Sequence, residues 1–266
     1  MNVFIHELKS YKKSTLIWMI SLSAIVVVFL MMFTAFTKDV ETSRSILSHL
    51  PPVVRSAFDI SMQNFFTIYG FFAYLFTFVG LAGAVQAMNL GVGVISKEDS
   101  GKTVDFLLTK PISRMRIVTS KLLAVLSLLL ATNVVFSAIA LATAKFVSTA
   151  PFSSRTFLMI SGILLLIQLF FMALGVLMSV IIPKIKSTIT VALPTVFTFF
   201  VIGTLGAIIG NDNVRYISPF KFYDANYVIS HNSYELKFLV IEAIFVIIAV
   251  VASYVIYIKK DIKAAA

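Results

Sequence analysis

The chain has 266 residues, of which 59% are hydrophobic and 13% are charged, and its mean hydropathy is +0.97. Soluble domains carry about 25% charged residues, so this composition excludes an ordinary water-soluble fold and is typical of a protein embedded in a membrane. The sequence has no cysteine, which excludes disulfide bonds and thiolate metal sites.

Residues 1–14 predict a short helix at the membrane surface. Phe4, Leu8 and Tyr11 recur at helical spacing on one face, while the three lysines of this segment lie largely elsewhere. This pattern is typical of an interfacial elbow helix that leads into a membrane span.

Six apolar stretches are long enough to cross a bilayer, since a helical span needs about 20 residues. They lie near residues 15–37, 66–95, 119–146, 156–182, 188–210 and 236–258. Backbone groups in hydrocarbon must find hydrogen bonds within their own segment, so each stretch predicts a helix. The sequence therefore predicts an all-α, polytopic membrane protein with six transmembrane helices in a single domain, residues 1–266.

The distribution of basic residues predicts the orientation. If both termini are cytosolic, 14 of the 22 Lys and Arg residues lie in cytosolic segments and 8 lie outside. Cytosolic loops of membrane proteins are enriched in Lys and Arg. We therefore expect a multi-pass protein of the cell membrane with both termini in the cytosol, and the net charge of +10 gives little support to nucleic-acid binding. The excess of Lys over Arg is compatible with a bacterial source.

A charged segment, residues 98–117, separates the second and third spans. Val104, Leu107 and Leu108 share one face of a short helix that Pro111 ends. An amphipathic helix held in the cytosol between two spans suits docking to a partner protein. The alternative is a helix that rests on lipid headgroups.

The run Gly101-Lys102-Thr103 matches the end of a phosphate-binding loop. That loop needs a glycine five residues earlier, where this chain has Ser96. Glu98 would also repel phosphate, and a membrane helix rather than a strand precedes the run. We therefore expect no ATP binding by this chain itself.

The segment between the second and third spans also resembles a family motif, which has an acidic start, a Gly-Thr, two leucines and a Pro-Ile-Ser-Arg run; here Lys102 separates Gly101 from Thr103. Its residues are Glu98, Gly101, Thr103, Leu107, Leu108, Pro111, Ser113 and Arg114. Lys121 follows, with Ser120 in place of a glycine, and further likeness lies in Glu7-Leu8-Lys9 and Ser218-Pro219-Phe220. With these motifs the sequence resembles the permease subunits of type-two ABC exporters, including the bacitracin-resistance and sodium-export permeases.

This resemblance implies a half-transporter that hydrolyses nothing itself. Two copies, or one copy and a related permease, would enclose a pathway and dock through the motif residues onto two cytosolic ABC ATPase subunits. ATP and magnesium would bind to those subunits, and this chain would hold no cofactor. In the resembled family the second and fifth membrane helices line the pathway, which draws attention to Phe197 and Phe200 as an apolar wall.

Polar residues within the spans complete the list of candidates. Gln86 and Asn89 in the second span either contact substrate or hold helices together, which is the commoner role. Glu242 lies about six residues into the last span, where a carboxylate needs a partner or a neutral form; it either contacts a cation, proton or substrate, or is a structural acid. In the fifth span, Gly206 and Gly210 predict a close helix contact.

The small number of charges in the spans predicts an amphiphilic or lipid-like cargo, such as a peptide antibiotic, moved outward. Export of a cation such as sodium is the alternative and would make Glu242 essential. A secondary transporter independent of ATP is a further alternative, although the paired interrupted helices typical of that class are not evident. The segment 211–235 is expected to be an outer loop before the last span.

Overall fold

The computed structural model describes residues 3–58, 60–101 and 113–259, and every regular element in these ranges is a helix. Six of the helices are long and apolar enough to cross a membrane. They are α1 (Val3–Lys38), α4 (Ile68–Gly101), α6 (Arg114–Val147), α7 (Ser154–Ile181), α8 (Ile189–Ile209) and α10 (Leu236–Lys259). The prediction of an all-α, polytopic membrane protein with six membrane helices is confirmed.

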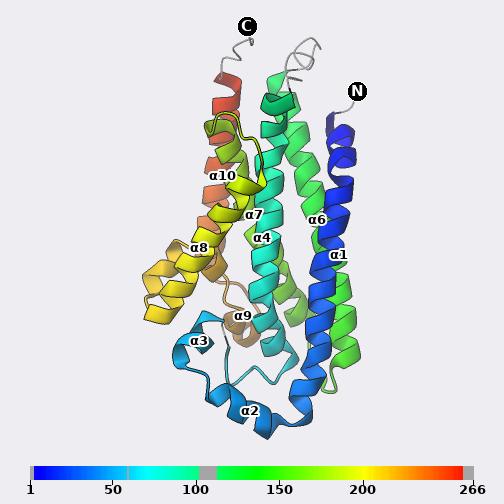
Figure 1. Ribbon diagram of the computed structural model, residues 1–266, viewed down its shortest axis with the longest axis vertical. Coiled ribbons are helices and arrows are strands. Elements are labelled where there is room, and N and C mark those ends of the chain that lie inside the picture. The colour runs from blue at the N-terminus through cyan, green and yellow to red at the C-terminus, as the bar shows by residue number, and fades with distance from the viewer. Residues whose placement is uncertain (1–2, 59, 102–112, 260–266) are drawn as a thin grey trace.

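The long helices form an elongated bundle with two distinct ends (Figure 1). α1 begins and α10 ends at one end, which we call the terminal end; α4 ends and α6 begins there too. The opposite, distal end carries the short helices α2 (Val40–Ser48), α3 (Pro52–Ala57) and α9 (Ala225–His231). Two 3-10 helices, η1 (Asp212–Tyr216) and η2 (Pro219–Lys221), precede α9, so the expected outer loop 211–235 contains three short helical elements.

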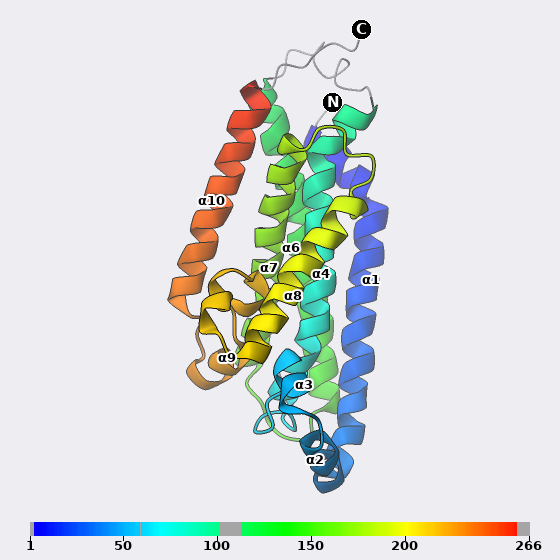
Figure 2. The ribbon, with the colours of Figure 1, turned by 60° about the vertical axis from the view of Figure 1, so that its left-hand side comes forward.

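α4 and α7 form the centre of the bundle, where α1 and α6 cover one side and α8 and α10 the other (Figures 1 and 2). Two glycines allow α4 and α7 to approach closely. A Cβ atom at Gly91 would lie 2.4 Å from the Met172 carbonyl oxygen, and one at Gly175 would lie 2.7 Å from the Met88 carbonyl oxygen. Any larger residue at this crossing would force the two helices apart.

A buried hydrogen-bonded network joins α4, α6 and α7. Gln86 donates to Thr132 over 3.1 Å and accepts from Gln168 over 3.0 Å. Asn133 donates in turn to the Gln168 side-chain oxygen. Interhelical hydrogen bonds of this kind contribute about 0.6 kcal/mol each within a membrane, so the network fixes the register of the three helices more than it stabilises the fold.

The first helix differs from the prediction. α1 runs without interruption from Val3 to Lys38, so residues 3–14 are the first turns of the first membrane helix and no separate elbow helix precedes it. The segment contains no proline or glycine to break a helix, and its buried face continues from Glu7 through Tyr11 and Thr15 to Leu22. At about 1.5 Å per residue α1 is about 54 Å long, so it extends well beyond a ~30 Å hydrocarbon core.

Candidate functional site

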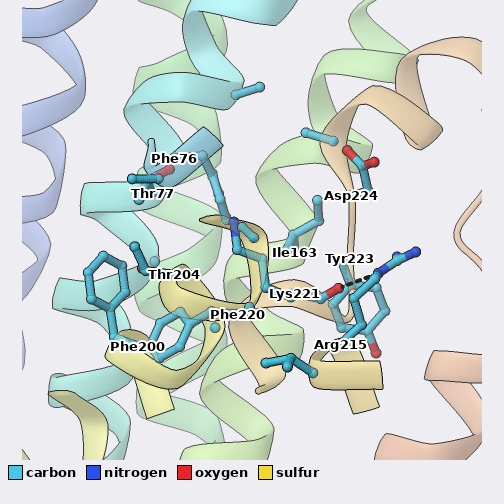
Figure 3. Close-up of a pocket in the computed structure, with 18 of the residues that line it drawn as sticks. Phe76, Thr77, Ile163, Phe200, Thr204, Arg215, Phe220, Lys221, Tyr223 and Asp224 are labelled. Atoms are coloured by element: carbon cyan, nitrogen blue, oxygen red, sulfur yellow. Dashed lines mark hydrogen bonds between the residues drawn. The ribbon is translucent and has the colours of Figure 1, made fainter. Parts of the chain in front are cut away.

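A cavity of about 320 Å³ opens near the distal end (Figure 3). On one side lie α4, α7 and α8. On the other side lies the chain from Asn211 to the end of α9 at His231, which we call the distal segment. The membrane helices supply a mainly apolar wall. Its residues are Ala73, Phe76, Thr77, Gly80, Ile163, Ile167, Phe200 and Thr204. The distal segment supplies Phe220 and Tyr223 together with charged and amide side chains, which are Asn211, Arg215, Lys221, Asp224 and Asn226. One side of the cavity is therefore apolar and the other polar.

Two glycines of α8 bring the distal segment onto this helix. A Cβ atom at Gly203 would lie 2.5 Å from Ser218 Oγ, and one at Gly206 would lie 2.4 Å from the Val214 side chain. Ser218 also donates to the Phe199 carbonyl oxygen over 2.8 Å. Of the two glycines expected to permit a close helix approach, Gly206 does so against the short helix η1, whereas a Cβ atom at Gly210 would meet nothing within 4 Å. Gly210 instead ends α8 in a left-handed conformation, with φ of 71°.

Ion pairs hold the polar side of the cavity in place. Glu235 binds both Arg215 and Lys237, and Arg215 also donates to the Lys221 carbonyl oxygen over 3.1 Å. The Arg215 guanidinium lies 4.6 Å from the centre of the Phe238 ring. Burial alone would raise the pKa of Glu235, but the hydrogen bonds from Arg215 and Lys237 outweigh it and hold the pKa below its usual value.

Glu242 lies behind this cavity. Its side chain is buried in α10 and accepts a hydrogen bond of 2.7 Å from the Tyr223 hydroxyl. Burial and the adjacent Glu242 carboxylate raise the pKa of Tyr223, so this phenol stays protonated and remains a donor. Because Tyr223 lines the cavity, Glu242 is separated from it by one side chain. Among the described residues, no group of three His, Cys, Asp or Glu side chains could hold a metal ion.

A comparison with protein families bears on the identity of the chain. The model of a family described as ABC-2 family transporter protein matches residues 1–262. The chain belongs to this family. A search of curated proteins gives no match. The resemblance to type-two ABC permeases is thereby confirmed, whereas the likeness to bacitracin-resistance and sodium-export permeases in particular stays a prediction. As an ABC-2 permease, the protein is a multi-pass transport component that acts in lipid with an ABC ATPase.

The candidate pathway residues of this ABC-2 permease occupy different environments. Phe200 lines the cavity, but Phe197 lies on an exposed face of α8. Gln86 is fully buried in the network between helices, and Asn89 accepts a hydrogen bond from Thr188. The structure thus brings only Phe200 of these four to the cavity.

Sequence reasoning did not single out the cavity residues from α7 and the distal segment, among them Ile163, Arg215 and Tyr223. Only the Ser218-Pro219-Phe220 motif drew attention to the distal segment. Its dense aromatic and charged residues are a signal that this loop does more than connect two spans.

The candidate ATPase-coupling residues lie at the terminal end or outside the described residues. Thr103, Leu107, Leu108 and Pro111 fall outside them, while Glu98 and Gly101 belong to the last turn of α4. Ser113 caps α6, since its hydroxyl accepts a hydrogen bond from the Arg116 amide. Arg114 donates to the Ile258 carbonyl oxygen over 3.2 Å, which ties the start of α6 to the end of α10. The structure describes only the two ends of residues 98–117, so the role of this segment in coupling to an ATPase stays a prediction.

Proposed function

We propose that this chain is the permease half of an ATP-driven exporter that moves an amphiphilic substrate outward. The ATP, with its magnesium, is hydrolysed on separate ABC ATPase subunits. The observation that carries the proposal is the two-sided cavity. A wall that includes Phe76, Ile163 and Phe200 accepts the apolar part of a ligand, while the distal segment offers donors and acceptors to its polar part. Ligand sites typically combine a mostly apolar lining with a few polar groups in this way.

The charge pattern supports an orientation of the bundle in the membrane. The segments rich in Lys and Arg are those of the terminal end, so the positive-inside rule places this end in the cytosol and the cavity toward the outside. A cavity near the outer surface suits release of the substrate after transport.

Coupling to ATP hydrolysis is assigned to residues 98–117. α4 and α6 enter and leave this segment at the terminal end, so an ATPase that docks there acts directly on the two helices. Packed helices switch between discrete arrangements rather than deform continuously, which allows closure of two ATPases to alternate the access of the pathway. Two copies of this chain, or one with a related permease, complete the transporter.

A cation exporter has less support. Glu242, its essential acid, is already bound by Tyr223 and lies outside the cavity lining. Sodium prefers several oxygen ligands, and a carboxylate that accepts from a phenol fits a structural acid better. A secondary transporter is disfavoured because the family is defined by ABC transport.

The test is ATP turnover by the permease reconstituted with its ATPase, measured against a panel of amphiphilic peptides, lipids and sodium. We expect stimulation by an amphiphile. Thr204→Trp fills the cavity and should weaken the apparent affinity for that amphiphile about tenfold, or by about 1.4 kcal/mol. Leu205→Trp is the matched control, because Leu205 is an exposed neighbour on the same helix. Stimulation by sodium alone, abolished in Glu242→Gln, would contradict the proposal.

A further inference from the structure

Three charged side chains gather where α1, α4 and α6 meet at the terminal end. Lys121 of α6 is 2% exposed, and its Nζ lies 3.4 Å from Glu7 Oε1 of α1. The same ammonium donates to the Val94 carbonyl oxygen of α4 over 2.6 Å. Lys121 thus binds both neighbouring helices at once, and its partner Glu7 is 7% exposed.

A second lysine contacts the same turn of α1. Lys97, near the end of α4, donates from Nζ to Ser10 Oγ over 2.9 Å, and its ammonium lies 3.6 Å from the centre of the Tyr11 ring. Ser10 and Tyr11 follow Glu7 by three and four residues, so they are its neighbours on the helix surface. Two lysines from different helices therefore lie within reach of one carboxylate.

The carboxylate is only partly satisfied. Within the described part of the chain, Glu7 Oε2 is buried without a hydrogen-bond partner, and so are Tyr11 Oη and Thr15 Oγ1. These atoms recur every four residues along one face of α1. Buried polar atoms are nearly always paired in folded proteins, so the unpaired Oε2 of Glu7 can accept a further donor.

The location gives the cluster its role. Lys97 lies four residues before the end of α4, and Lys121 lies seven residues after the start of α6. The two lysines therefore flank residues 98–117, the segment proposed above to dock the ATPase, which we call the docking segment. Relative movement of these two helices would shift one lysine toward Glu7 and the other away. Buried ion pairs contribute little net stability, which favours a role in selecting between arrangements.

We propose that Glu7 is a positioning residue that makes α1 follow the docking segment, by exchanging its ion pair between Lys121 and Lys97. In the arrangement seen here Glu7 pairs with Lys121. When ATP closes the ATPases, the free Oε2 takes up the Lys97 ammonium, and the terminal end of α1 moves away from α6 and toward α4. This inference rests on the proposed function, in which the segment between α4 and α6 receives the motion of the ATPase.

Spin labels on the permease–ATPase complex in lipid nanodiscs test the exchange. Lys9→Cys and Arg116→Cys place labels at exposed sites of α1 and α6, and the chain has no other cysteine to interfere. Trapping with ATP and vanadate should populate a state in which the two labels are further apart. Lys97→Gln should lower the population of this state about tenfold, as the loss of one stabilising contact in a two-state equilibrium predicts. In a Glu7→Gln background, where neither ion pair can form, Lys97→Gln should leave the population of this state unchanged.

The control is Lys13→Gln, which removes the same charge from an exposed position of α1 and should leave the populations unchanged. Lys97 is exposed, so its replacement tests the exchange even if Glu7→Gln does not assemble. Equal separation in Lys97→Gln and the unsubstituted complex, with normal ATP turnover, would overturn the exchange and leave the proposed function intact. A complex without ATP turnover would contradict both.

Discussion

At the scale of single residues, Glu235 and its basic partners act as a scaffold for the cavity. Glu235 has a side chain that is only 12% exposed, and its two basic partners, Arg215 and Lys237, come from different elements. Arg215 also reaches the backbone next to Phe222, at the Lys221 carbonyl. The ion pairs therefore fasten η1 to the start of α10 and fix the polar side of the cavity.

This arrangement predicts a pH dependence of stability. The pKa of Glu235 is held below its ordinary value of 4.5, so its ion pairs stabilise the folded state fully above that pH and are lost as the pH falls through the lower, folded-state pKa. Glu235→Gln should lower the free energy of unfolding by about 1.5–3 kcal/mol at pH 7, and by much less at pH 3. Thermal unfolding of both proteins in one detergent between these pH values measures the difference. An equal deficit at both pH values would show that the carboxylate charge is not involved.

At the scale of elements, the bundle depends on the close crossing of α4 and α7. Both helices are apolar on all faces, so hydrophobicity alone does not determine the register in which α4 packs against α7. The Gly91 and Gly175 contact and the hydrogen bonds of Gln86 set it instead. Small residues and a few polar pairs are the usual determinants of helix packing in membranes, because lipid is as apolar as the protein core.

Gly91→Ala tests the crossing. Because the new Cβ would meet backbone that cannot move aside, we expect a loss of about 1–3 kcal/mol in the free energy of unfolding. Gly80→Ala on the same helix is the control, since its Cβ would make an ordinary contact of 3.5 Å with Ile167. That variant should stay within about 1 kcal/mol of the original, because alanine favours helix. Equal stability of the two variants, measured by unfolding in mixed detergent micelles, would show that the crossing tolerates separation.

The sequence predicted the six membrane helices closely, because length and hydropathy decide which segments enter a bilayer. It could not tell that Phe200 lines the cavity while Phe197 is exposed, since both lipid and protein interior accept a phenylalanine. The prediction of a separate elbow helix was wrong for a related reason. An amphipathic pattern predicts a helix but does not show where that helix ends. Pairing between distant residues, such as Glu7 with Lys121, depends on the fold and has no signal in one sequence.

At the scale of the whole molecule, one helix connects the two candidate functional regions. α4 contributes Ala73 and Phe76 to the distal cavity, and Val94 and Lys97 to the charged cluster at the terminal end. Its 34 residues span about 50 Å at about 1.5 Å each. A stiff helix of this length can carry a displacement at the docking segment to the cavity, which gives the proposed transport a mechanical route.

The most direct test of the account is uptake of a fluorescent amphiphilic peptide into inside-out vesicles that contain this chain and its ATPase. With the terminal end outward in such vesicles, we predict accumulation that requires ATP, both proteins and the leucines of the docking segment, so that Leu107→Asp with Leu108→Asp abolishes it. Unsubstituted chain at matched expression is the reference. Accumulation without the ATPase, or undiminished in the double variant, would contradict the claim that ATP hydrolysed on a separate subunit drives export through this permease.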